Sequence, residues 1–151
     1  MKVKSLEDTK NLANNISDVI NAGDIIFIYG EIGVGKTTLT RFIINYLESK
    51  NGIKKSDVLS PTFNIVYDYD VKSHHIMHYD LYRLKSGDEI KELGIFENSE
   101  NSVKIIEWPE LIKNKIENKI ELHFSYSNGL DYRNIDILRF GKWKKFNSDE
   151  I

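Results

Sequence analysis

The chain has 151 residues, about the length of one domain, and its 40% hydrophobic content excludes an intrinsically disordered chain. Its 21 basic and 23 acidic side chains leave a formal charge of −2, which argues against a protein that holds nucleic acid through a basic surplus. The sequence has no cysteine, so disulfide frameworks, thiol nucleophiles, zinc knuckles and iron–sulfur clusters are excluded.

The start of the chain predicts a helix followed by a buried strand. Ser5 and Asp8 have the spacing of a helix N-cap, and apolar residues then recur at helical intervals until the stretch 21–24. The apolar run 25–29 has no polar alternation, which is typical of a strand buried on both faces. This run is far too short to span a membrane, and residues 2–10 lack the apolar core of a signal peptide. We therefore expect a soluble cytoplasmic protein that has no contact with a membrane.

The middle of the chain predicts a second helix and then a hairpin. A glycine-bearing turn at 30–35 leads into an amphipathic helix, which ends at 50–52. Alternating residues predict a strand at 63–70 and a second extended stretch at about 75–82, joined by a polar connection as an antiparallel hairpin. The remaining predicted elements are a short helix at 88–97, a buried strand at 103–107, a helical turn opened by Pro109, and strands around 120–124 and 135–137.

These elements predict a single α/β domain. Strands alternate with helices, and the chain contains neither a fixed-period repeat nor a linker that could divide it. We expect a mostly parallel central sheet flanked by helices, with the antiparallel hairpin at one side. The domain is predicted to span residues 1–141, and residues 142–151 are predicted to form a polar C-terminal tail.

A phosphate-binding loop is the most specific motif in the sequence. Residues 30–37, Gly-Glu-Ile-Gly-Val-Gly-Lys-Thr, fit the pattern G-x-x-x-x-G-K-[ST] without a mismatch. Glycines let backbone amides approach a triphosphate, and the positive end of the following helix dipole favours the anion. Lys36 can reach the β- and γ-phosphates, and the Thr37 hydroxyl can bind magnesium. The motif therefore predicts a P-loop NTPase fold that binds a nucleoside triphosphate with Mg²⁺.

Two acidic residues are candidates to complete this site. Glu107 ends a mostly apolar strand just before Pro109, so it is expected at the carboxyl end of the sheet, where ligands gather. Asp80 lies near the end of the second hairpin strand, in a position where aspartate is uncommon. Either carboxylate could instead be an ordinary surface group. His78 is the weaker candidate, since a packing or hydrogen-bonding histidine is more common than a catalytic one.

The segment Ser60-Pro61-Thr62-Phe63 precedes the hairpin. Its threonine could sense the γ-phosphate, as switch loops do in other nucleotide hydrolases, or it could belong to a plain turn.

The sequence distinguishes among P-loop protein classes only in part. A GTPase is set aside, because the two N-K-x-D-like stretches at 114–117 and 118–121 both carry glutamate in place of aspartate, and no D-x-x-G occurs. A small P-loop kinase stays open, although it would need a lid and an acceptor pocket rich in arginine. A nucleotide sensor that does not hydrolyse its ligand is the non-enzyme alternative.

Four motifs together resemble one family. The chain resembles TsaE, the P-loop ATPase family of bacterial tRNA threonylcarbamoyladenosine biosynthesis, in order and over nearly its whole length. Residues 5–9 and 133–135 also look like the opening and closing segments of that family. The motifs that carry the resemblance are residues 30–38, Ser60-Pro61-Thr62-Phe63, the His78-to-Leu84 stretch and Ile106-Glu107-Trp108-Pro109-Glu110.

The resemblance implies a function and a set of site residues. A TsaE-like protein hydrolyses ATP with Mg²⁺ in support of the TsaD–TsaB complex, which places threonylcarbamoyl on adenosine 37 of tRNA, so tRNA is a partner only through that complex. By position, Thr37, Asp80 and Glu107 would hold the metal, and Glu107, Lys36 and Asp80 would be catalytic. Whether Glu107 or Asp80 activates the water is left open. The implied nucleotide-binding residues are Thr9, Glu31, Ile32, Gly33, Val34, Gly35, Lys36, Thr37, Thr38, Thr62 and Arg133.

Overall fold

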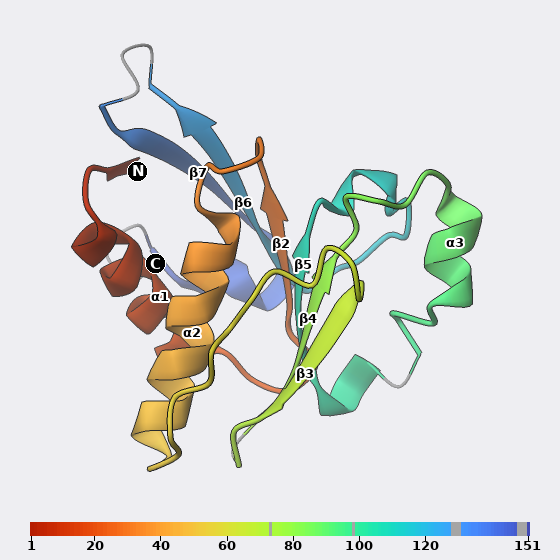
Figure 1. Cartoon of the computed structure of the whole chain (residues 1–151), viewed down its shortest axis with the longest axis horizontal. Coiled ribbons are helices and arrows are strands. Elements are labelled where there is room, and N and C mark those ends of the chain that lie inside the picture. Colours follow the sequence, from red (N-terminus) through yellow and green to blue (C-terminus); the bar gives the residue numbers. More distant parts are fainter. Residues whose placement is uncertain (73, 98, 128–130, 148–150) are drawn as a thin grey trace.

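Alternating and continuous apolar runs pair into one mixed sheet in the computed structural model, which describes residues 1–72, 74–97, 99–127, 131–147 and 151. Within these residues the sheet has seven strands in the order β1-β7-β6-β2-β5-β4-β3 (Figure 1). The strands β6, β2, β5 and β4 run parallel at its centre, and β3, β7 and β1 join antiparallel. The bounds are β1 Lys2–Val3, β2 Ile25–Tyr29, β3 Val66–Asp70, β4 His75–Asp80, β5 Val103–Glu107, β6 Lys119–Tyr126 and β7 Arg133–Arg139.

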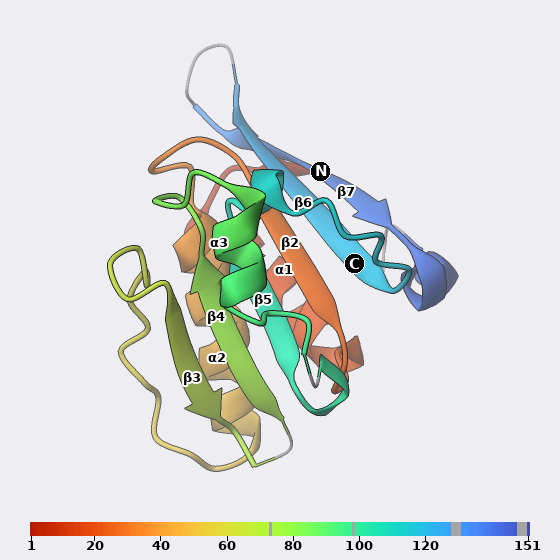
Figure 2. The ribbon, with the colours of Figure 1, turned by 90° about the vertical axis from the view of Figure 1, so that its right-hand side faces the viewer.

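Helices cover the sheet in layers. The two long helices, α1 (Leu6–Val19) and α2 (Lys36–Lys50), pack on one face, and the short α3 (Gly87–Glu92) lies on the other (Figures 1 and 2). Each face has its own apolar core, because alternate residues of the central strands point to opposite sides. Short 3₁₀ turns occur at Ser99–Asn101, Pro109–Leu111 and Gly141–Lys145. No helix in the described part of the chain is long and apolar enough to cross a membrane.

Local sequence signals account for the elements next to the P-loop. The Ser5 hydroxyl accepts from the Asp8 amide and the Asp8 carboxylate accepts from the Ser5 amide, so the predicted N-cap is a complete capping box. Strand β5 is buried along its whole length and β2 is buried from 25 to 28, as their continuous apolar composition predicts. The predicted antiparallel hairpin is confirmed as β3 and β4.

The structure departs from the predicted elements in three places. The first hairpin strand begins at Val66, because Ile65 adopts a left-handed φ of 70° and residues 62–64 form a turn. The helix predicted at 88–97 ends at Glu92, and Gly94 then takes a φ of 58°. Strand β1 is an addition to the predicted elements: it is only two residues long, and it pairs residues 2–3 with residues 133–134 of β7.

The segment after residue 141 packs against the domain. Trp143 is completely buried in the core that also contains α1 and α2, and the Lys142 ammonium lies 2.6 Å from the buried Asp24 carboxylate. The predicted tail at 142–151 is therefore attached over its first described residues. Phe146 and Ile151 also pack against this core, so apolar side chains attach a segment whose composition is mostly polar.

Candidate nucleotide-binding site

The P-loop connects β2 to α2 at the carboxyl edge of the parallel strands. It turns through three glycines with positive φ, Gly30 at 136°, Gly33 at 77° and Gly35 at 114°. Gly35 is the N-cap of α2 and supplies no side-chain cap, so the first amides of the helix are open to a ligand. A helix of 15 residues directs the positive end of its dipole to this point. The loop thus has the backbone geometry of an anion site.

We expect Gly30→Ala to destabilise the fold by about 2–4 kcal/mol, since it combines overpacking with an unfavourable backbone conformation. A Cβ at this position would lie 2.7 Å from the Phe124 carbonyl oxygen. Gly52→Ala is the matched control, because Gly52 also has positive φ (67°) but a Cβ there would meet no atom within 4 Å, and it should cost about 1 kcal/mol. Chemical denaturation measures both free energies of unfolding. Equal losses would show that contact with β6 does not constrain the loop.

Lys36 lies across the loop that precedes it. Its ammonium donates to the carbonyl oxygens of Gly30 at 2.6 Å and Glu31 at 2.9 Å, and it lies 4.0 Å from the centre of the Trp108 ring. Burial lowers the pKa of Lys36, while the nearby carboxylates, Glu107 first among them, act in the opposite direction. The ammonium is therefore held in a poorly hydrated position where a phosphate would be a strong partner.

The two candidate carboxylates are neighbours. Asp80 and Glu107 end the parallel strands β4 and β5 and are register partners. Only 3% of Asp80 and 2% of Glu107 is exposed, which excludes the interpretation of either as a solvated surface group. Their strands end at the edge where the P-loop begins, as expected for a ligand site of an α/β sheet.

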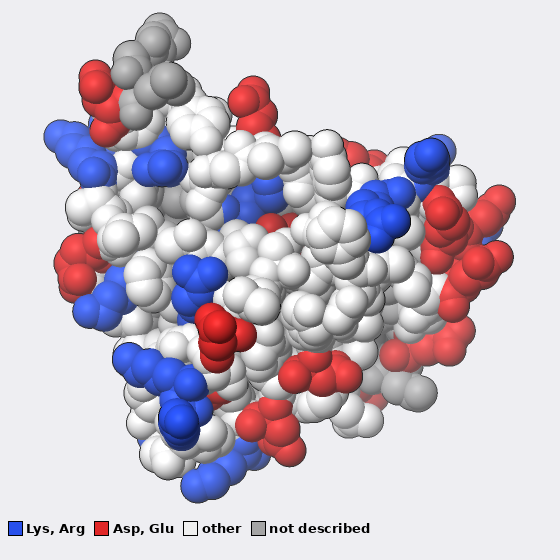
Figure 3. Space-filling model, viewed as in Figure 1, with Lys and Arg blue, Asp and Glu red and all other residues white. Residues whose placement is uncertain are grey.

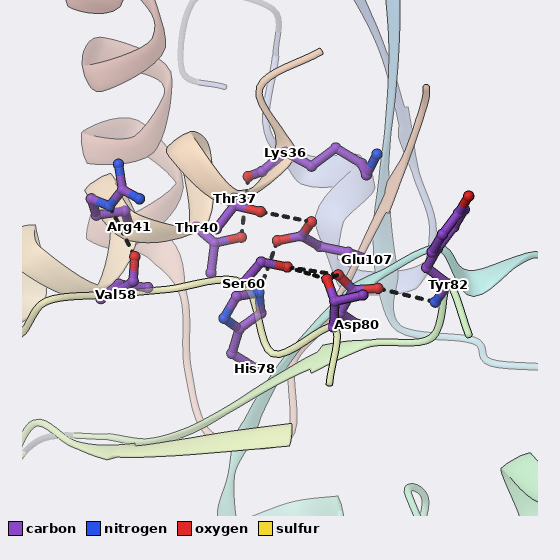
Figure 4. A network of polar contacts seen from close by, with 11 residues as sticks. Lys36, Thr37, Thr40, Arg41, Val58, Ser60, His78, Asp80, Tyr82 and Glu107 are labelled. Atoms are coloured by element: carbon purple, nitrogen blue, oxygen red, sulfur yellow. Dashed lines mark hydrogen bonds and ion pairs between the residues drawn. The ribbon is translucent and has the colours of Figure 1, made fainter. Parts of the chain in front are cut away.

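Glu107 is held on both carboxylate oxygens. The Thr37 hydroxyl donates to Oε2 at 3.0 Å, and His78 Nε2 lies 2.8 Å from Oε1. In Figure 4 the Glu107 carboxylate lies between Thr37 above and His78 below. The first residues of α2 are thereby connected to β5 and β4.

Asp80 accepts hydrogen bonds from the loop that leads from α2 to β3. The Ser60 hydroxyl donates to its Oδ2 at 2.7 Å, and the Tyr82 amide donates to Oδ1 at 3.0 Å (Figure 4). The Thr62 hydroxyl also donates to Oδ2, at 2.6 Å. Farther back, Arg41 Nε on α2 donates to the Val58 carbonyl at 3.0 Å. The predicted loop residue Thr62 is thus brought into the site.

Two hollows meet at the P-loop. The first, about 370 Å³, is lined by Ile32, Gly33, Gly35, Lys36, Thr37, Thr38, Ser60, Thr62, Asp80, Tyr82, Glu107 and Trp108. The second, about 310 Å³, is lined by Lys4, Ser5, Leu6, Thr9, Gly33, Val34, Gly35, Thr38, Phe124 and Arg133. Together they gather every predicted nucleotide-binding residue except Glu31, which is exposed beside them.

Two aromatic residues of the site are not predicted from the sequence. Tyr82 and Trp108 line the first hollow with ring centres 4.8 Å apart, and Trp108 takes a left-handed φ of 59°. The Pro109 that follows is the local signal for an irregular backbone at this place, but it does not specify which way the ring turns. Val34, predicted as a ligand residue, is fully buried in the core, and its amide donates to the Glu31 carbonyl oxygen at 3.3 Å.

The donor set fits magnesium bound with a nucleotide. Among the described residues, no group of three or more histidine, cysteine, aspartate or glutamate side chains could hold a metal ion alone. Mg²⁺, however, commonly takes one or two carboxylates, with phosphate oxygens and water as its other ligands. Thr37, Asp80 and Glu107 offer one hydroxyl and two carboxylates at the P-loop, which suits that mode.

The family model described as "Threonylcarbamoyl adenosine biosynthesis protein TsaE" matches residues 3–135. The chain belongs to the TsaE family. Curated TsaE proteins agree with this assignment: the one from Rickettsia conorii is 41% identical over 111 residues, and the one from Aquifex aeolicus is 32% identical over 108. The matched regions cover 74% and 72% of this chain. They cover 61% of the Rickettsia conorii protein and 74% of the Aquifex aeolicus protein.

The same fold is found in a solved structure. The crystal structure of Bacillus subtilis YdiB superposes with a TM-score of 0.76, covering 96% of this chain and 88% of that one at 24% identity. The predicted α/β class, a P-loop fold with a mostly parallel central sheet, is confirmed.

Proposed function

We propose that this TsaE-family protein binds ATP with Mg²⁺ and hydrolyses it in support of the TsaD–TsaB complex, which modifies adenosine 37 of tRNA with threonylcarbamoyl. One observation carries the proposal: Thr37, Asp80 and Glu107 converge on the P-loop from three separate elements. The names of the curated relatives support the same modification pathway.

The nucleotide would lie across both hollows. Loop amides and the Lys36 ammonium would hold the phosphates in the first hollow, where charge-assisted hydrogen bonds are strong. Thr9 and Arg133 would flank the nucleoside in the second. Thr38 lines both hollows and would lie between the two parts of the nucleotide.

The carboxylates would divide the remaining work. Thr37, Glu107 and Asp80 would hold Mg²⁺, which when bound neutralises charge on the phosphates. Asp80 already accepts three hydrogen bonds and Glu107 accepts two, so Glu107 keeps more of the roughly four acceptor positions of a carboxylate. We therefore propose that Glu107 is the general base that accepts a proton from the attacking water. Asp80 would bind the metal and hold the loop that contains Thr62.

The distribution of charge fits an indirect role at tRNA. The face in Figure 3 carries acidic side chains over α3 and mixed charges elsewhere. The first turn of α3 contains Asp88 and Glu89. On the described part of this face the basic side chains form no continuous band of the kind that neutralises a nucleic-acid backbone. The charges on this face and the formal net charge of −2 support contact with tRNA through partner proteins.

Asp80→Asn should raise the Mg²⁺ concentration needed for half-maximal ATP hydrolysis by about tenfold, because one metal-facing negative charge is lost while the amide retains the side chain's shape. A magnesium titration of ATPase activity gives this value. Asp68→Asn is the charge-matched control, because Asp68 is an exposed residue of β3, and it should leave the titration unchanged. A wild-type magnesium dependence in Asp80→Asn would remove Asp80 from the metal site.

The pathway assignment is tested by threonylcarbamoylation of tRNA over several turnovers. TsaD–TsaB supplied with substrates should continue to modify tRNA only when this protein and ATP are both present. The control is the same mixture with the Lys36→Ala variant, which should not sustain turnover. Full modification without this protein would refute the assignment, and phosphate transfer to a small acceptor would favour the kinase alternative.

A further inference from the structure

We propose that His78 is a positioning residue for hydrolysis: its ring fixes the plane of the Glu107 carboxylate against the first turn of α2. The inference rests on the proposed ATP hydrolysis and adds a residue to it. The observation behind it is the contact of 2.8 Å between His78 Nε2 and Glu107 Oε1, with no exposed surface on the His78 side chain and 2% on that of Glu107.

The direction of this hydrogen bond follows from chemistry. Carboxylate oxygens only accept when ionised, so Nε2 carries the hydrogen and donates it to Glu107. The other ring nitrogen, Nδ1, is buried and has no hydrogen-bond partner among the residues that the structure describes. Among the described residues, Glu107 is therefore the one hydrogen-bond partner of the His78 ring.

The sheet prevents the ring from moving away. His78 sits in β4 between β5 and β3, where its register partners are Ile105 and Tyr67. It is completely buried, so its rotamer is set by packing rather than by solvent. A donor fixed in this way holds Glu107 Oε1 in one place, while the Thr37 hydroxyl holds Oε2.

Two fixed donors determine the orientation of the carboxylate. With one donor on each oxygen, the carboxylate cannot rotate about its last torsion without losing a hydrogen bond in a buried site. A misplacement of about 1 Å in a catalytic group can cost about a hundredfold in rate. His78 would thus act on the chemical step without touching the nucleotide.

The test compares His78→Leu with His78→Gln, which replace the ring by an apolar group and by an amide that can still donate. In His78→Leu, kcat for ATP hydrolysis should fall by about 10- to 100-fold with KM within about threefold, and ADP affinity by calorimetry should stay within about threefold. In His78→Gln, at least part of kcat should return. Denaturation of both variants establishes that they remain folded.

The outcomes separate this inference from the proposed function. Loss of kcat in His78→Leu with recovery in His78→Gln supports the positioning role. A kcat near wild type in His78→Leu, or equal losses in both variants, overturns it while hydrolysis by the wild type stands. Absence of hydrolysis by the wild type, with its partners supplied, would overturn both.

Discussion

Lys36→Ala is expected to weaken ATP binding by at least about a hundredfold, equivalent to about 2.7 kcal/mol, because the triphosphate loses its principal point charge. Lys36 is 5% exposed, and its ammonium donates hydrogen bonds to two carbonyl oxygens of the loop. Phosphate oxygens would replace these acceptors when ATP binds. Isothermal titration calorimetry with ATP and Mg²⁺ measures the change. Circular dichroism should show the same fold.

Lys55→Ala is the control for this substitution. Lys55 is an exposed lysine in the connection after α2 and lies outside the residues that line either hollow. Its removal changes the net charge by the same amount and should leave the affinity unchanged. If Lys36→Ala binds ATP as tightly as wild type, residues 30–37 are not the phosphate site.

Glu107→Gln is expected to retain ATP binding within about threefold and to reduce hydrolysis by about 10²- to 10³-fold, which is typical for the loss of a general base. The amide has almost the same shape and can keep contacts with Thr37 and His78, so the loss reports the missing basic oxygen. Steady-state phosphate release and calorimetry separate the two effects.

Glu110→Gln makes the same chemical change three residues later, on an exposed side chain. It should hydrolyse ATP at nearly the wild-type rate. Wild-type turnover in Glu107→Gln would mean that another residue activates the water, and Asp80 would become the leading candidate.

The sequence predicts the parts of this site that depend on contiguous residues. The P-loop is predictable because all its functional groups lie in residues 30–37: the glycines act through the backbone, and Lys36 and Thr37 act through their side chains. Glu107 is placed correctly because an apolar strand ends just before Pro109. The hairpin that carries Asp80 follows from alternation with period two.

The parts that escape prediction depend on residues distant in the chain. His78 is 29 residues from Glu107, and their contact follows from the register of β4 against β5 rather than from either local pattern. The left-handed φ of Ile65 shortens β3 and lets its carbonyl accept from the Asp80 amide, in a stretch where alternation alone favours a strand. Tertiary contacts override local preference at both places.

ATP hydrolysis by this chain in the service of TsaD–TsaB is tested most directly by phosphate release. Wild-type protein is assayed with ATP and Mg²⁺, first alone and then with TsaD–TsaB and tRNA, beside Glu107→Gln in the same mixtures. We predict a rate that rises at least about tenfold with the partners and a Glu107→Gln variant that stays near background. A rate that the partners leave unchanged, or one that Glu107→Gln sustains, would contradict the proposed function.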